Sequence, residues 1–199
     1  MNSRAKIGLS VLAASSLVLA GGCSLTRAGY QTAPYQVVRK TPGFEIRDYP
    51  AIRVAETKEA GGGFMRLFRY IDHGNAESQG IAMTTPVWMD RTESQGTMSF
   101  VLPSGLATPP APKDPEVRIR ELPAGSWAVR RFKGSGRGPD DAAARVLGEE
   151  LRKAGIPTTG TPRFAYFDPP WIPGFLRRNE VMLQVVLGDA KGGISSPAK

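Results

Sequence analysis

The chain has 199 residues and a formal net charge of +8, from 26 basic and 18 acidic residues. It contains one cysteine and one histidine. This composition excludes a disulfide framework and leaves no His/Ser/Asp set for nucleophilic catalysis. No phosphate-binding or dinucleotide-binding glycine motif occurs in the sequence. We therefore do not expect an enzyme.

The first 22 residues have the pattern of an export signal. Arg4 and Lys6 precede an apolar run, 7–20, that is too short for a comfortable membrane span. The run leads into Leu-Ala-Gly-Gly-Cys, which resembles a bacterial lipobox that is cut before Cys23. We expect residues 1–22 to be a lipoprotein signal peptide and Cys23 to carry lipid. The alternative is an ordinary secretory peptide with an incidental cysteine.

The lipid anchor implies a location outside the cytoplasm. Ser24 after the cysteine is similar to signals for the outer membrane, so we expect its periplasmic face in a Gram-negative cell. Two of the 26 basic residues lie in the signal, which leaves 24 against 18 acidic residues, a net charge of +6. That balance favours anionic partners. An exported chain without a basic block interleaved with aromatics is not expected to bind nucleic acid.

The predicted elements follow in chain order. Residues 23–34 have no periodic pattern and are predicted to be a tether, and residues 188–199 a flexible tail. Between them we expect one domain of about 155 residues. Alternation and apolar runs predict strands over 35–40, 44–49, 51–57, 98–102, 117–122, 126–132 and 180–187, and extended chain over 81–89 and 164–171. Apolar residues at helical spacing predict helices over 64–71 and from Pro139 to Leu151.

One heptapeptide pattern occurs twice. Residues 45–51 read Glu-Ile-Arg-Asp-Tyr-Pro-Ala and residues 118–124 read Arg-Ile-Arg-Glu-Leu-Pro-Ala. Each copy is followed by a strand, a glycine-rich break, a helix and two extended segments. The Pro-rich segment 103–115 is the predicted linker between halves of about 35–103 and 116–187. This order predicts an α+β fold of two pseudo-symmetric halves, a mainly antiparallel sheet and a cleft between the halves.

The same residues resemble the SOUL/heme-binding protein family. The first half carries Phe-Glu-Ile-Arg-Asp-Tyr from residue 44 and Ile-Ala-Met-Thr-Thr-Pro-Val from residue 81. The second half carries Tyr-Phe-Asp-Pro-Pro-Trp from residue 166 and Arg-Arg-Asn-Glu-Val from residue 177. The resemblance covers roughly 35–187. It implies a distorted antiparallel β-barrel with two flanking helices, and binding of heme or a related tetrapyrrole.

The resemblance also bears on iron ligation. One type of family member is thought to place a histidine after Glu-Ile-Arg, where this chain has Asp48. A carboxylate is an unusual heme ligand. His73, the only histidine, and Met83 are weak candidates, because the first is expected in a loop and the second is more often core filler. We therefore expect a tetrapyrrole to be held without an axial histidine.

A flat macrocycle with propionates needs an apolar surface and cations at its edge. The first predicted helix can supply the surface through Phe64, Leu67 and Phe68 and the cations through Arg66 and Arg69. The predicted second wall is formed by Trp171 and Phe175, with Arg177 as a further candidate for the anion. The alternative for each apolar residue is a place in the core.

Three other interpretations stay open. Arg177, Arg178 and Glu180 fit a structural ion-pair cluster better than a ligand site. A hydrolase similar to gyrase-inhibitor-like relatives would use Glu180 with Trp88 or Trp171. An envelope lipoprotein without a ligand would have its cleft filled by its own side chains. We expect a monomer whose partners are a tetrapyrrole or similar flat anionic ligand and, through the lipid, a membrane.

Overall fold

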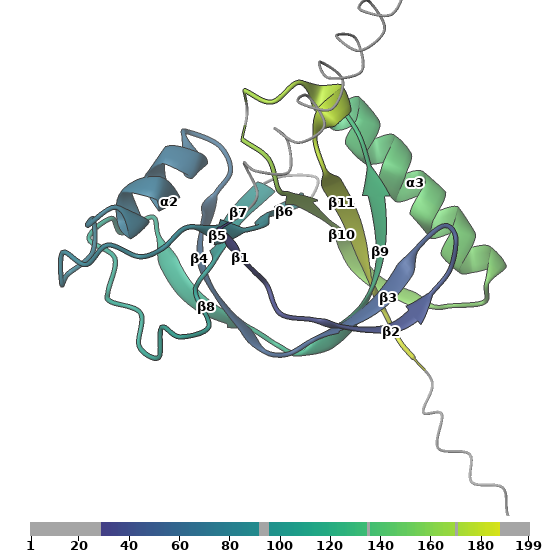
Figure 1. Ribbon diagram of the computed structural model, residues 1–199, viewed down its shortest axis with the longest axis horizontal. Helices are drawn as coiled ribbons and strands as arrows, with labels where there is room; N and C mark the ends of the chain where they lie inside the picture. Colours follow the sequence, from purple (N-terminus) through teal and green to yellow (C-terminus); the bar gives the residue numbers. More distant parts are fainter. Residues whose placement is uncertain (1–28, 92–95, 135, 170, 188–199) are drawn as a thin grey trace, which may run out of the picture.

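The protein was analysed as a computed structural model that describes residues 29–91, 96–134, 136–169 and 171–187. The predicted signal peptide, Cys23 and the predicted tail, 188–199, lie outside the described residues. Two helices and one large antiparallel sheet make the fold α+β, as predicted (Figure 1). Within the described residues, no helix combines the length and apolar character that are needed to cross a bilayer.

The elements of each half follow one another along the chain in the predicted order. The helices are α2 (Gly63–Ile71) and α3 (Arg137–Lys153), with a short 3-10 turn η1 (Gly174–Leu176). The strands are β1 (Gln31–Thr32), β2 (Gln36–Lys40), β3 (Glu45–Tyr49), β4 (Ile52–Lys58), β5 (Thr84–Thr85), β6 (Val87–Arg91), β7 (Gly96–Val101), β8 (Arg118–Leu122), β9 (Gly125–Phe132), β10 (Thr158–Tyr166) and β11 (Asn179–Val185).

Strand order in the main sheet has a twofold pattern. The nine strands follow the order β2-β3-β9-β11-β10-β6-β7-β4-β8. Leaving out β2, each strand of one half has its counterpart at the mirrored place, with the pseudo-twofold axis between β10 and β6. Each heptapeptide strand pairs with the second strand of the other half, β3 with β9 and β8 with β4. The repeat therefore reflects a duplicated fold in which the halves exchange strands.

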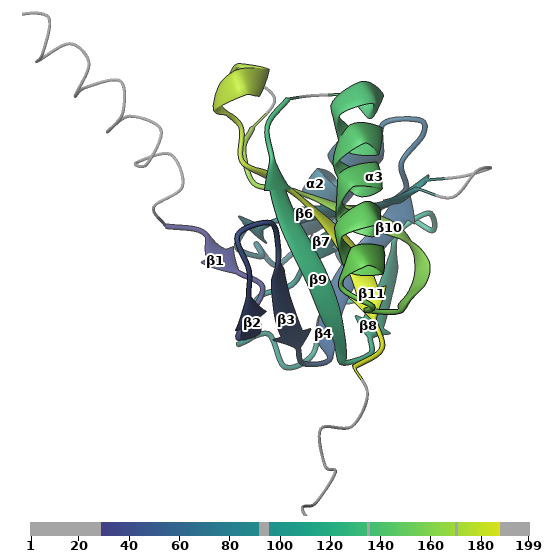
Figure 2. The same cartoon turned by 90° about the vertical axis from the view of Figure 1, so that its right-hand side faces the viewer.

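The sheet curves strongly, with its helices on opposite sides of the molecule (Figure 1). Among the described residues, the strand pairings run from β2 to β8 without joining these two edge strands. One core cluster lies between α3 and the sheet around Leu147, and another lies between α2 and the sheet around Leu67. A third contains no helix residue and lies on the other face, because Met182 and Ala165 belong to it while their neighbours Val181 and Phe164 pack toward α3. Figure 2 shows α3 lying across β9 and β11.

Three segments differ from the prediction. Residues 31–32 were predicted to be tether but form β1, which pairs with β5, and Ala33 is buried. The pairing is too short to produce an alternating pattern. Strand β10 begins at Thr158, six residues before the predicted extended segment. The prediction missed the first half of this strand because it is polar and exposed, although it pairs with β11. The Pro-rich linker is packed into the fold, where the Pro110 carbonyl accepts a hydrogen bond from the Tyr70 hydroxyl at 3.0 Å.

Candidate functional site

An apolar groove of about 230 Å³ lies beside α2. Three parts of the chain form it: the entry to β1, the outer flank of α2 with β5 and the start of β6, and the end of β10 with the segment that follows. Its lining consists of Tyr30, Phe64, Phe68, Met83, Thr85, Val87, Tyr166, Phe167, Asp168, Pro169 and Trp171. The structure thus brings together four residues of the sequence prediction, Phe64, Phe68, Met83 and Trp171.

Helix α2 divides its apolar face between the core and the groove. Gly63 opens the helix where a Cβ atom would lie 2.4 Å from the Lys58 carbonyl oxygen, so a larger residue would push the helix away from β4. Leu67 and Ile71 are buried against the sheet. Phe64 and Phe68 stay about 40% exposed, with ring centroids 6.3 Å apart and planes at 13°. The prediction that Leu67 contacts the ligand is therefore corrected, because this side chain is fully inside the core.

The predicted cations do not gather on the groove. Arg66 turns back to the loop before the helix, where it donates to Thr57 Oγ1 at 3.1 Å and to the Gly61 carbonyl at 2.9 Å. Arg177 donates from Nε to the Ile172 carbonyl at 2.7 Å. Arg69 is exposed on α2 next to Phe68. Of the predicted cations, Arg69 is therefore the one whose side chain stays in solvent, one residue after the groove residue Phe68 and outside the lining itself.

The two weak candidates for iron lie in different places. His73 has a positive φ of 64° just after α2, is exposed, and its Nδ1 lies 3.1 Å from Asp72 Oδ1. It is not part of the groove lining. Met83 is on the lining. The described residues contain no group of three or more His, Cys, Asp and Glu side chains placed to hold a metal ion.

The predicted cleft between the halves is nearly filled. On the face without helices, the Arg163 guanidinium lies 5.0 Å from the Trp88 ring centroid and 4.7 Å from that of Trp127. Arg163 also donates two hydrogen bonds to Asp90, at 2.7 and 2.8 Å. The cavity left between these side chains is about 10 Å³. The predicted cleft is therefore closed on this face, whereas the groove beside α2, which takes Phe64 from the first half and Tyr166 from the second, is an open space between the halves.

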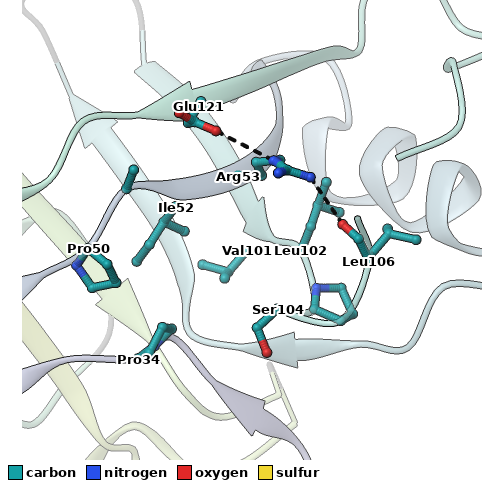
Figure 3. A pocket seen from close by; sticks show the side chains of 11 residues that line it. Pro34, Pro50, Ile52, Arg53, Val101, Leu102, Ser104, Leu106 and Glu121 are labelled. Carbon is teal, nitrogen blue, oxygen red and sulfur yellow. Dashed lines mark hydrogen bonds and ion pairs between the residues drawn. The ribbon is translucent and has the colours of Figure 1, made fainter. Parts of the chain in front are cut away.

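A second hollow of about 260 Å³ lies at the other end of β4 (Figure 3). Pro34, Pro50 and Leu102 line it. At its rim Arg53 pairs with Glu121 and donates to the carbonyl of Leu106, so the polar atoms there are already engaged. Its lining lacks aromatic rings, and it is a poorer platform for a flat ligand than the groove beside α2.

A buried ion-pair cluster occupies the face of the sheet near β3 and β11. Arg47 and Glu180 are each 1% exposed, and Arg47 Nη1 donates to Glu180 at 2.7 Å. Arg178 and Arg131 donate to Glu180 as well, at 2.9 and 3.4 Å. Burial acts to raise the pKa of Glu180, but the hydrogen bonds and charges of Arg47 and Arg178 outweigh it and hold that pKa below its ordinary value.

This cluster corrects one expectation and confirms another. Alternation along residues 44–49 places Arg47 with Glu45 on the face opposite Phe44 and Ile46, which predicts a polar face. Arg47 is nevertheless buried under the Tyr35 ring, 4.3 Å from the centroid. Arg178 and Glu180 form the structural ion pair that the sequence favoured, and the Asn179 amide caps the Gly134 carbonyl at 2.7 Å.

Two pseudo-symmetric halves with an apolar groove beside one helix define a duplicated α+β domain with room for a small flat molecule. The chain belongs to the SOUL heme-binding protein family, whose profile matches residues 30–184. The match begins at residue 30, just before β1, so the family profile includes this strand. Heme binding is a property of this family as a whole. No curated protein matches the chain by sequence.

Solved structures with this fold are distant in sequence. The C-terminal domain of EcmrR is 15% identical, with a TM-score of 0.53 over 76% of this chain and 98% of that one. A hydrolase from Listeria innocua is 9% identical, with a TM-score of 0.53 over 75% of this chain and 94% of its own. At such identities the likeness concerns the fold alone.

Proposed function

We propose that the groove beside α2 binds a tetrapyrrole or a similar flat, apolar, anionic molecule. The observation that carries the proposal is the groove lining, in which Phe64, Phe68 and Trp171 face one space from two different parts of the chain. Each of the three is more than a third exposed, so apolar area remains to be covered by a ligand. Membership in the SOUL family supports the same ligand class.

The residues fit the macrocycle better than they fit its iron. Aromatic rings offer flat apolar contact, and Arg69 at the edge is free in solvent to meet a propionate. Heme, when bound, brings a redox-active iron. His73 lies outside the lining, so the Met83 thioether and the Tyr30 phenol are the lining groups that would have to hold the iron. Because the proposal places the binding energy in the aromatic contacts and not in iron ligation, we expect metal-free porphyrin to bind about as tightly as hemin.

Catalysis by Glu180 is not favoured by its surroundings. The carboxylate accepts hydrogen bonds from three arginines and is buried, which leaves it no oxygen to act as a base on a substrate. Of its two suggested partners, Trp88 is 2% exposed, and Trp171 lines the groove, of which Glu180 is not a part. The filled cavity beside Arg163 agrees with the alternative of an envelope lipoprotein without a ligand there. The groove beside α2 offers a different surface on which a ligand can bind.

Hemin titration with absorbance detection tests the proposal. We expect a saturable Soret shift that metal-free porphyrin competes away. Phe68→Ser and Trp171→Ser should each weaken binding about tenfold, because losing one aromatic contact of about 1.5 kcal/mol corresponds to that factor. His73→Ala should bind as the natural protein does. Val38→Ser, an exposed apolar change on β2, is the matched control. Unsaturable binding, or equal affinity in all variants, would contradict the proposal.

We further propose that Cys23 anchors the protein to a membrane outside the cytoplasm, on the periplasmic face of the outer membrane in a Gram-negative cell. The lipobox-like sequence supports this. Mass spectrometry of the purified protein should show a lipid-modified N-terminal cysteine, and Cys23→Ser should abolish the modification. An unmodified cysteine at a mature N-terminus, or cleavage elsewhere, would indicate an ordinary secretory peptide.

A further inference from the structure

Exposed apolar side chains surround the mouth of the groove. Trp171 is 76% exposed and Phe175 is 69% exposed, both on the segment between β10 and β11. On α2, Met65 follows Phe64 and is 51% exposed. Exposed apolar side chains on two segments that line one groove mark an interaction site rather than ordinary surface scatter.

The residue types at this surface fit a lipid bilayer. The segment that carries Trp171 and Phe175 projects beyond the end of the sheet in Figures 1 and 2. Tryptophan is enriched where proteins meet the membrane–water interface, because its ring is apolar and its N–H needs a polar partner. A projecting loop with two exposed aromatic rings can enter the interface without any change in the sheet.

Positive charge flanks the same surface. Arg69 lies beside Phe68, and Lys133 is exposed next to Gly134, whose N–H donates to the Gly174 carbonyl at 3.1 Å. Asp168, the acid of the projecting segment, accepts a hydrogen bond from the Arg178 backbone N–H, which ties it to the base of the loop. Cations near an anionic leaflet strengthen attachment to it. The charge distribution therefore complements anionic phospholipid.

The N-terminal chain enters the fold at the groove. Tyr30 is part of the lining, and Cys23 precedes it by only seven residues, a reach of at most about 25 Å at 3.6 Å per residue. Whatever holds residue 23 at a membrane therefore keeps the groove close to that membrane. The other faces of the domain have no such constraint.

We propose that the surface formed by Phe64, Met65, Phe68, Trp171, Phe175 and Leu176 docks onto an anionic lipid bilayer, with Trp171 and Phe175 in the interface and the groove opening toward it. The inference goes beyond the proposed ligand and holds for any apolar molecule. It gives the groove a route by which such a molecule passes between the bilayer and the protein without crossing bulk water.

Quenching of tryptophan fluorescence tests the docking in the natural full-length protein. The protein is reconstituted into vesicles of phosphatidylethanolamine and phosphatidylglycerol whose acyl chains carry bromine. Because Trp88 is buried and Trp127 is half-buried, Trp171 is the ring that the bromine should reach. We expect strong quenching, which Trp171→Phe removes for the most part and Trp127→Phe, the matched control, leaves in place. Phe175→Ser should reduce it while thermal unfolding stays unchanged.

Each outcome decides one part of the inference. Absent quenching, or equal quenching in Trp171→Phe, would overturn docking through this loop. Equal quenching in phosphatidylcholine vesicles would overturn the preference for anionic lipid. A blue shift that grows with protein concentration without lipid would assign the surface to a second copy of the chain. Hemin titration in detergent stays separate, so loss of ligand binding and loss of docking are distinguishable.

Discussion

The same tripeptide, Ile-Arg followed by an acid, lies at two mirrored places in the sheet and meets two different environments. Arg47 in β3 is 1% exposed, whereas Arg120 in β8 has 54% of its side chain exposed. Strand β3 lies between β2 and β9, but β8 ends the sheet beside β4. The backbone duplication therefore fixes where each arginine lies, and the unduplicated β2 and Tyr35 decide which of them is buried.

The regions beside the two helices differ in a similar way. Beside α2, the end of β10 contributes to an apolar groove. Beside α3, the end of β6 contributes Arg91, which pairs with the fully buried Asp140, while the Tyr166 hydroxyl donates to the same carboxylate at 2.6 Å. Burial and the neighbouring Asp140 raise the pKa of Tyr166, so it remains a donor. At this place one half thus has a candidate binding surface, and the other has a buried polar cluster of Arg91, Asp140 and Tyr166, which we call the polar brace.

The largest expected effect is a difference in stability between substitutions of Arg47 and of Arg120. Arg47→Met should lower the free energy of unfolding by about 3–5 kcal/mol, because it leaves the buried Glu180 without its main partner. Arg120→Met removes an exposed pair with Glu56 and should cost less than about 1 kcal/mol. Denaturant titration followed by tryptophan fluorescence measures both. Equal losses would mean that burial does not distinguish the two copies.

Low pH should destabilise the protein at the buried copy of the heptapeptide, where Arg47 pairs with Glu180. The pKa of Glu180 is lowered in the folded state, so its contribution to stability is present above its unfolded pKa of about 4.3 and is lost as pH falls through the folded value. Glu180→Gln should therefore destabilise the protein most at neutral pH, and the difference from the natural protein should shrink below pH 4. Glu56→Gln is the matched change beside Arg120, with a smaller loss at pH 7. A constant difference for Glu180→Gln across this range would refute the assignment.

Substitutions beside α3 and α2 should affect different properties, the first mainly stability and the second mainly ligand binding. Asp140→Asn should cost about 1.5–3 kcal/mol, because it weakens charged hydrogen bonds in a buried site, and should change hemin affinity less than Phe68→Ser does, because it reaches the groove only through Tyr166. Phe68→Ser should do the reverse, with a smaller loss of stability and a weaker complex. Thermal unfolding and hemin titration on the same preparations give both quantities. If both substitutions changed the same quantity, the division between brace and groove would be wrong.

The smallest expected effect concerns the acid of each heptapeptide. Asp48 accepts a hydrogen bond from Ser126 Oγ at 2.6 Å, and at the mirrored place Glu121 lies 3.5 Å from Arg53 Nε. Asp48→Ala should cost about 1 kcal/mol, since the bond is half-buried, and Glu121→Ala should be within about 0.5 kcal/mol. Denaturant titration resolves the pair, and a larger loss for Glu121→Ala would reverse the comparison.

Much of the fold follows from local pattern. Periodicity placed α2 and α3 and most strands to within a few residues, because a face that must be buried repeats at the period of its element. The groove residues Phe64, Phe68 and Trp171 were also named from the sequence. Tyr30 and Thr85 were not, since a two-residue strand leaves no periodic signal.

The sequence by itself determined the duplication, the α+β class, the family and the aromatic character of the site. Only the tertiary structure decided that Leu67 belongs to the core, that Arg47 is buried, and that Arg163 fills the space between the halves. The physical reason is that burial of a side chain depends on what covers its strand or helix. Those covering groups, the Tyr35 ring over Arg47 and strands β4 and β7 under Leu67, come from other parts of the chain.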